Sequence, residues 1–114
     1  MELSIENAGP YVSVRLYGHL DSRGSGDIYD AVVGLGALGP GHVVLDLEAV
    51  TGATRAGCGV IFVAAKMLLV RSGRKLHIYN ASPEVADILT KAGFDHLIDV
   101  RPRAIGFPAV HRAA

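Results

Sequence analysis

The sequence is short of the residues that build disulfide frameworks, cysteine-based metal sites and membrane spans. Its 114 residues include one cysteine, Cys58, and no tryptophan. A single cysteine excludes a disulfide within the chain. The longest apolar run, from Gly59 to Val70, is interrupted by Lys66 and is shorter than the roughly 20 residues that cross a bilayer. The start, MELSIENAG, lacks the basic and apolar parts of a signal peptide, so we expect a cytoplasmic protein with no membrane insertion.

Neither sign of charge dominates, because 11 basic residues balance 11 acidic ones. This balance gives no electrostatic reason to expect binding to nucleic acid or to an anionic membrane. The five histidines show no metal-ligand spacing, and the glycine-rich pieces at 24–26 and 57–59 lack the lysine of a phosphate-binding loop. We therefore expect no metal and no cofactor. Half of the residues are hydrophobic, which suffices for the core of one domain, expected over 1–114.

Apolar periodicity predicts alternating strands and helices after an opening hairpin. The expected strands lie at 1–5, 11–17, 42–47, 76–79 and 97–100, and the expected helices at 27–38, at 56–72 and from Pro83, with Ser82 as its cap. Residues 101–114 are expected to form an irregular tail. The order β-β-α-β-α-β-α-β predicts an α/β fold with a mixed, mostly parallel sheet of four to five strands and three to four helices.

The stretch from Thr51 to Ser72 organises the rest of the chain. Thr54 is suited to cap the helix that follows, because its hydroxyl can accept a hydrogen bond from a first-turn amide. Small residues, from Ala56 to Gly59, leave that turn almost bare. A bare helix start suits an anion, a phosphorylated side chain or a closely approaching partner. The helix is apolar nearly all round, so it is either buried on most sides or keeps a face for association, and a homodimer stays open.

Four pieces of the chain resemble the STAS domain family, named for sulfate transporters and anti-sigma factor antagonists. They are Gly18-His19-Leu20-Asp21, the strand Val43 to Leu47, the helix start Thr54 to Gly59, and the run from Ser82-Pro83 to Gly93-Phe94. In the antagonists the helix start reads Asp-Ser-Ser-Gly or a close variant. The second serine there is phosphorylated by a partner kinase that is also the anti-sigma factor. These four positions correspond here to Thr54, Arg55, Ala56 and Gly57.

The resemblance implies a regulatory binding module that is not an enzyme. The phosphoacceptor position holds Ala56, which has no hydroxyl, and Thr54 is the possible substitute. The expected partner is a serine kinase-type anti-sigma factor. The expected contact patch consists of Asp21, Thr54, Arg55, Ala56, Gly57 and Cys58. Some STAS subunits of transporters also carry alanine at the acceptor position, so the alternative is a STAS subunit of a transporter complex that docks an ATPase.

Plainer interpretations of the same residues stay open. Thr54 fits an ordinary helix cap, Arg55 a solvated loop cation, and Asp21 a turn residue. Cys58 fits a small core filler. A third functional hypothesis is a small enzyme or ligand carrier that uses Cys58, because a helix start lowers the pKa of a thiol.

Overall fold

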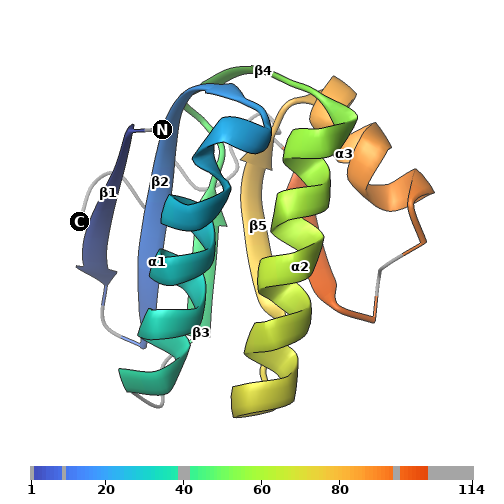
Figure 1. Cartoon of the computed structure of the whole chain (residues 1–114). Coiled ribbons are helices and arrows are strands. Elements are labelled where there is room, and N and C mark those ends of the chain that lie inside the picture. The colour runs from blue at the N-terminus through green and yellow to red at the C-terminus, as the bar shows by residue number, and fades with distance from the viewer. Residues whose placement is uncertain (1, 9, 39–41, 94–95, 103–114) are drawn as a thin grey trace.

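After an opening hairpin, strands and helices alternate along the chain, except where two strands follow one another in its middle (Figure 1). The computed structural model describes residues 2–8, 10–38, 42–93 and 96–102. The strands are β1 (Glu2–Ala8), β2 (Tyr11–Leu20), β3 (His42–Asp46), β4 (Val50–Ala53), β5 (Leu76–Ala81) and β6 (Ile98–Pro102). The helices are α1 (Ser25–Leu38), α2 (Arg55–Ser72) and α3 (Pro83–Lys91), with a short 3-10 turn at Ser22–Gly24.

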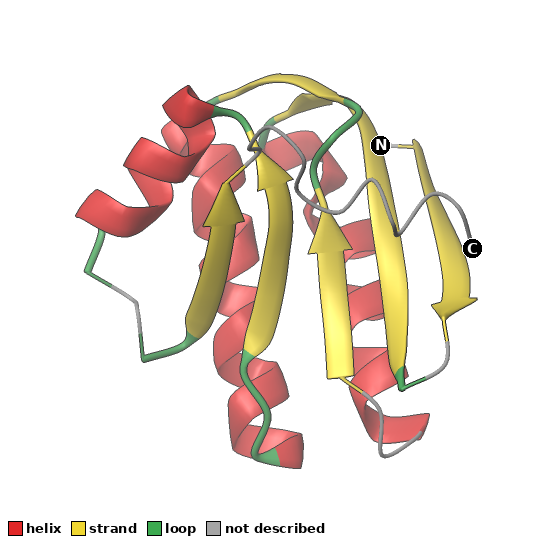
Figure 2. Ribbon diagram, turned by 180° about the vertical axis from the view of Figure 1, so that it is seen from behind, coloured by secondary structure: helices red, strands yellow, loops and turns green. Residues whose placement is uncertain are grey.

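The strands lie in the order β1-β2-β3-β5-β6, and β4 pairs with β2 off this path. β1 runs antiparallel to β2, and the other pairs are parallel. The crossovers through α1, α2 and α3 all step in the same direction across the sheet. Because such crossovers are almost always right-handed, the three helices fall on one face, as Figures 1 and 2 show. The predicted α/β fold with a mixed, mostly parallel sheet is confirmed.

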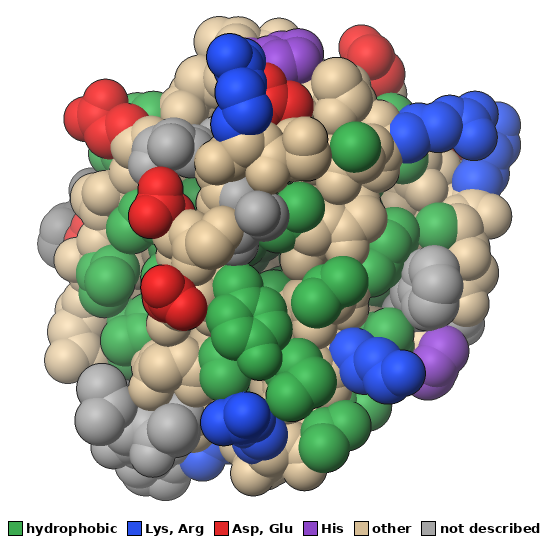
Figure 3. Space-filling view, viewed as in Figure 1, with side chains coloured by type: hydrophobic (Ala, Val, Ile, Leu, Met, Phe, Trp, Pro, Cys, Tyr) green, Lys and Arg blue, Asp and Glu red, His purple; other side chains and the backbone are tan. Residues whose placement is uncertain are grey.

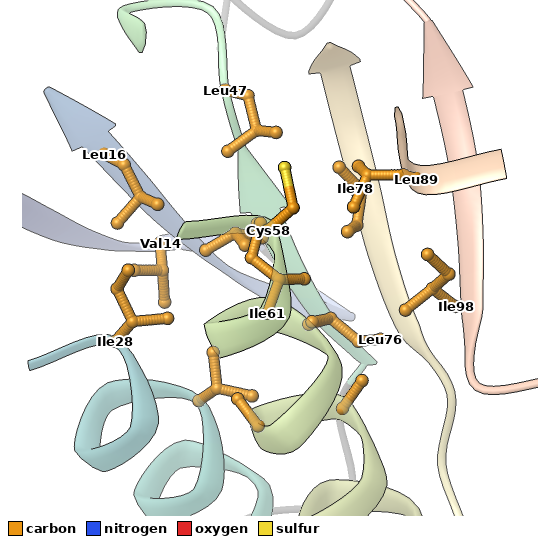
Figure 4. Packing of buried hydrophobic residues seen from close by; sticks show 14 of the residues in the cluster. Val14, Leu16, Ile28, Leu47, Cys58, Ile61, Leu76, Ile78, Leu89 and Ile98 are labelled. Carbon is orange, nitrogen blue, oxygen red and sulfur yellow. The ribbon is translucent and has the colours of Figure 1, made fainter. Parts of the chain in front are cut away.

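The core fills the layer between this sheet face and the helices (Figure 4). Along β2 the side chains alternate, so that Val14 and Leu16 are fully buried while Ser13 and Arg15 point to the opposite face. Ile61 and Leu68 bring the inner side of α2 onto the sheet. Burial of such side chains stabilises the fold by about 1.5–3 kcal/mol each relative to exposure.

The two long helices approach each other closely at Gly36 of α1. A Cβ atom at this position would collide with the side chain of Leu68 on α2. Gly36 weakens the helix prediction when the sequence is considered alone, because glycine costs about 1 kcal/mol relative to alanine in a helix. Its place at the α1–α2 contact gives a packing reason for that cost.

The sheet gains a strand that the sequence pattern did not predict. The expected loop between 48 and 54 contains β4, which pairs with the end of β2 where the register shifts between Gly18 and His19. The sheet therefore has six strands in place of four to five. The helices α1 and α2 begin at Ser25 and Arg55, slightly earlier than expected, and β6 includes two residues of the expected tail. The rest of that tail, 103–114, lies outside the described residues.

The sheet face opposite the helices carries a polar network that joins β2, β3 and β5. Arg15 donates to the Asp46 carboxylate through Nε at 3.3 Å and through a terminal nitrogen at 3.2 Å. The same terminal nitrogen lies 3.1 Å from the Glu48 carboxylate. Asn80, at the end of β5, donates its side-chain amide to Asp46 at 3.1 Å. These bonds join the middle of β2 to the carboxyl ends of β3 and β5.

Candidate functional site

The start of α2 is capped by Thr54, as the sequence predicts. The Thr54 backbone is extended, with φ −97° and ψ 164°, and its hydroxyl oxygen accepts a hydrogen bond from the Gly57 amide at 3.0 Å. The Thr54 carbonyl accepts from the Cys58 amide at 3.0 Å. A threonine cap is typically worth about 1 kcal/mol, so it fixes where the helix begins. The cap serves one amide of the first turn, whose residues Arg55 and Ala56 are exposed.

This helix start is anchored to the end of β2. The Thr54 amide donates to the Leu20 carbonyl at 2.9 Å. Gly57 packs against the same backbone, since a Cβ atom there would lie 2.7 Å from the Leu20 carbonyl carbon and 2.8 Å from the Cα of Asp21. Only glycine fits this approach without a shift of the backbone. Asp21 is thereby brought beside the first turn of α2, although 33 residues of sequence separate it from Thr54.

Burial divides the predicted contact patch into two parts. Thr54, Arg55 and Ala56 are exposed, and Asp21 is half-buried. Gly57 and Cys58 are buried. The surface that a partner can reach at this end of α2 therefore consists of Thr54 to Ala56 with Asp21 beside them. Gly57 and Cys58 support this surface from below.

Arg23 is a member of the site that sequence reasoning missed. Its Nε and a terminal nitrogen donate to Asp21 Oδ2 at 3.0 and 2.6 Å, and its backbone amide donates to Oδ1 at 2.9 Å. These hydrogen bonds lower the pKa of Asp21 to about 2, from an ordinary value of 3.8. The bonds from the Arg23 side chain have the larger effect, and the bond from its backbone amide has the smaller one. The signal in the sequence is an Asp followed two residues later by a donor, which is the pattern of an Asx turn.

The Asp21–Arg23 pair shapes the loop more than it stabilises the fold. The Arg23 side chain is 86% exposed, and such surface ion pairs contribute little. Arg55 at the start of α2 and Arg23 beside it are exposed cations, and Arg23 is bonded to the Asp21 carboxylate. Two positive charges and one negative charge leave these three groups with a net charge of +1.

Cys58 lies in the core and is unsuited to nucleophilic chemistry. It is 1% exposed, and Figure 4 shows its sulfur pointing toward the side chains of Leu47 and Ile78. Burial raises the pKa of the Cys58 thiol above its ordinary value. A nucleophilic cysteine needs the opposite shift, toward the thiolate. This arrangement counts against the hypothesis of an enzyme or carrier built on Cys58.

The described residues contain neither a candidate metal site nor a candidate membrane-spanning helix. Within residues 2–8, 10–38, 42–93 and 96–102, no group of three or more His, Cys, Asp or Glu side chains is placed to hold a metal ion. None of the helices described there combines the length and the apolar character needed to cross a bilayer.

Comparison with known proteins settles the family. The model of the STAS domain matches residues 3–111 of this sequence. The chain belongs to the STAS domain family. Among curated proteins, none matches it significantly.

Solved structures share the STAS fold at low sequence identity. The anti-sigma factor antagonist SpoIIAA in its unphosphorylated form is 20% identical, with a TM-score of 0.68 over 98% of this chain and 96% of its own. An anti-sigma factor antagonist from Mycobacterium paratuberculosis is 19% identical, with a TM-score of 0.71 over 89% and 85%. The murine anion transporter Slc26a9 is 14% identical, with a TM-score of 0.67 over 96% of this chain and 19% of its own. At these identities the likeness concerns the fold.

Proposed function

We propose that this STAS domain is a non-enzymatic regulatory module of the anti-sigma factor antagonist type. It binds a kinase-type anti-sigma factor through the start of α2, at Thr54, Arg55 and Ala56, with Asp21 beside them. The cytoplasm is the compartment in which such a partner would meet it.

One observation carries the proposal. The start of α2 is attached to the end of β2 through backbone contacts, and its outer side is exposed to solvent. Thr54 and Gly57 fix it to the end of β2, while Arg55 and Ala56 remain exposed. A surface held by its own backbone loses little conformational freedom when a partner binds, which favours affinity. The likeness to two anti-sigma factor antagonists supports this choice of partner class.

The module differs from its phosphorylated relatives by having no acceptor at the equivalent position. A phosphate adds about −1.5 to −2 charges and can block a complementary surface. Ala56 cannot carry one, so we propose that binding here is constitutive with respect to that switch. The Thr54 hydroxyl is the nearest substitute, and it accepts the Gly57 amide as part of the helix cap.

The test measures binding to each kinase-type anti-sigma factor of the source organism by isothermal titration calorimetry. We expect one of them to bind the wild-type chain. Ala56→Glu places a bulky negative group at the exposed start of α2, and we expect it to weaken that binding by ~100-fold, as the loss of a central contact does.

The matched control is Ala92→Glu, the same substitution at an exposed position just after α3. It should bind as the wild type does. If Ala92→Glu weakened binding as much as Ala56→Glu, the contact would lie elsewhere. If no kinase-type anti-sigma factor bound the wild-type chain, the proposed partner class would be wrong.

The second candidate is a STAS subunit of a transporter complex that docks an ATPase. The observation that favours it is the likeness to part of the anion transporter Slc26a9. Copurification of the chain with a transporter ATPase, with no binding to any anti-sigma factor, would decide for this candidate.

A further inference from the structure

The outer side of α2 carries an exposed apolar stripe. Ala56, Val63 and Val70 are spaced by seven residues, which is two helical turns, so their side chains line up along one face. Val63 is 57% exposed and Val70 is 69% exposed. The opposite side of the helix, including Ile61 and Leu68, is buried against the sheet. The exposed valines of the stripe therefore do not contribute to the hydrophobic core of this chain.

Only cations flank the stripe on α2. Arg55, Lys66 and Arg71 are exposed along it, and the helix has no acidic residue, although the whole chain is neutral. Figure 3 shows hydrophobic side chains gathered over the lower half of α2 with Lys and Arg side chains beside them. The excess of positive charge is confined to α2, because the neighbouring helix α1 carries the exposed Asp27 and Asp30 and no basic residue.

We propose that the stripe of Ala56, Val63 and Val70, with Lys66 and Arg71 beside it, docks a protein partner whose apolar strip is edged with carboxylates. The inference rests on the docking role proposed above for the start of α2, and it describes the partner chemically. Ala56 belongs to both surfaces, so the partner's contact continues from the start of the helix to its last turn. Complementary charges steer such a partner and fix its register on the helix.

A protein surface fits the stripe better than an anionic membrane does. Helices that lie on membranes insert large side chains such as Trp, Phe and Leu, whereas the exposed apolar residues here are two valines and an alanine. Clusters of about four to eight Lys and Arg mark lipid-binding surfaces, and α2 carries only Arg55, Lys66 and Arg71. Small β-branched side chains suit close packing against another protein.

The test uses a synthetic amphipathic helical peptide with leucines along one side and glutamates along both edges. The second peptide has lysine in place of every glutamate. Each is titrated into the isotope-labelled full-length chain and followed by NMR. We expect the glutamate peptide to shift the amide signals from Val63 to Arg71, and the lysine peptide to leave them unchanged. We expect Lys66→Glu to weaken binding of the glutamate peptide by ~10-fold, because like charges then meet.

Val63→Glu is compared with Ile5→Glu, because Ile5 on β1 is also exposed, at 53%. We expect the first substitution to abolish peptide binding and the second to leave it intact, with both chains folded by circular dichroism. Shifts spread evenly over the chain, or equal shifts with both peptides, would overturn the inference. So would binding to phosphatidylglycerol vesicles that Lys66→Glu weakens in the absence of any peptide binding.

Failure of this inference can be told apart from failure of the proposed function. If a kinase-type anti-sigma factor no longer bound Ala56→Glu but still bound Val63→Glu and Lys66→Glu, the proposed function would stand. The stripe would then not be a docking surface. If the glutamate peptide shifted the signals of the stripe while no anti-sigma factor bound, the inference of an acidic, apolar partner would stand. The proposed class of partner, a kinase-type anti-sigma factor, would be wrong.

Discussion

Gly57 on α2 lies against the backbone carbonyl of Leu20 at the end of β2, so closely that no side chain fits between them. The same carbonyl accepts the Thr54 amide at 2.9 Å. One carbonyl group therefore fixes both the cap and the first turn of α2. The direction in which Arg55 and Ala56 face outward is set by the end of β2.

Gly57→Ala should destabilise the protein, whereas Gly59→Ala should stabilise it. The added methyl at position 57 would press on the backbone of Leu20 and Asp21, and such overpacking costs about 1–3 kcal/mol. At position 59 a Cβ atom meets nothing within 4 Å, so alanine gains its helix propensity of about 1 kcal/mol. Urea denaturation of the two variants measures both effects. Equal stabilities would contradict the close approach at Gly57.

The Asp21 carboxyl should titrate with a pKa of about 2 in the folded protein. Because this pKa is lowered on folding, its contribution to stability is present above the ordinary value of 3.8 and is lost as the pH falls toward 2. NMR titration of the side-chain carboxyl signal measures it. In Arg23→Ala the donors of the guanidinium are gone, so the pKa should rise toward its ordinary value. An unchanged pKa in that variant would mean that Arg23 is not the cause.

Asn80 should tolerate glycine better than alanine. Its φ is +62°, a region that glycine adopts freely and that costs other residues about 1–2 kcal/mol. Asn80→Gly loses the hydrogen bond to Asp46, worth about 1.5–3 kcal/mol for a charged acceptor. Asn80→Ala loses that bond and adds the backbone strain. Chemical denaturation should rank wild type above glycine and glycine above alanine; the reverse order of the two variants would refute the strain.

Cys58 should react with Ellman's reagent far more slowly in the native protein than after unfolding. Burial hides the sulfur and raises its pKa, so both access and thiolate fraction are low. Stopped-flow absorbance with and without urea compares the two rates. A native rate above that of free cysteine would revive the hypothesis of a nucleophilic thiol.

Incubation with a cognate kinase and ATP should leave the mass of the chain unchanged, because Ala56 offers no hydroxyl. Intact mass spectrometry detects the addition of one phosphate. The double variant Arg55→Ser with Ala56→Ser restores the acceptor chemistry and should gain a phosphate if the kinase still docks. A phosphate on Thr54 of the wild-type chain would show that the switch has moved to the helix cap.

The sequence predicted the elements whose cause is local. The caps at Thr54 and Ser82 are formed by side chains three residues from the amides they serve, and both are present. The hairpin and the α/β alternation follow from periodicity within each segment. The strand β4 was missed because Val50 to Ala53 shows no such period, and its pairing depends on the shifted register at Gly18.

Relationships that depend on tertiary structure could not be predicted from spacing. Arg15 and Asp46 are 31 residues apart and meet because the register of β2 and β3 places them side by side. The burial of Gly57 and Cys58 beneath the predicted contact patch likewise follows from how α2 meets β2. The family resemblance indicated which segment to consider, whereas the packing determines which of its residues a partner can touch.

The order of the strands also bears on how the chain folds. In the path β1-β2-β3-β5-β6, the order of the strands across the sheet is the same as their order in the sequence. Each strand after β1 therefore pairs with a strand that precedes it in the chain. The entropy of closing a loop grows with its length, and these loops span only one crossover each. A chain emerging from the ribosome therefore finds the edge for its next strand already assembled. Such stepwise growth keeps the contact order low for a sheet that is mostly parallel.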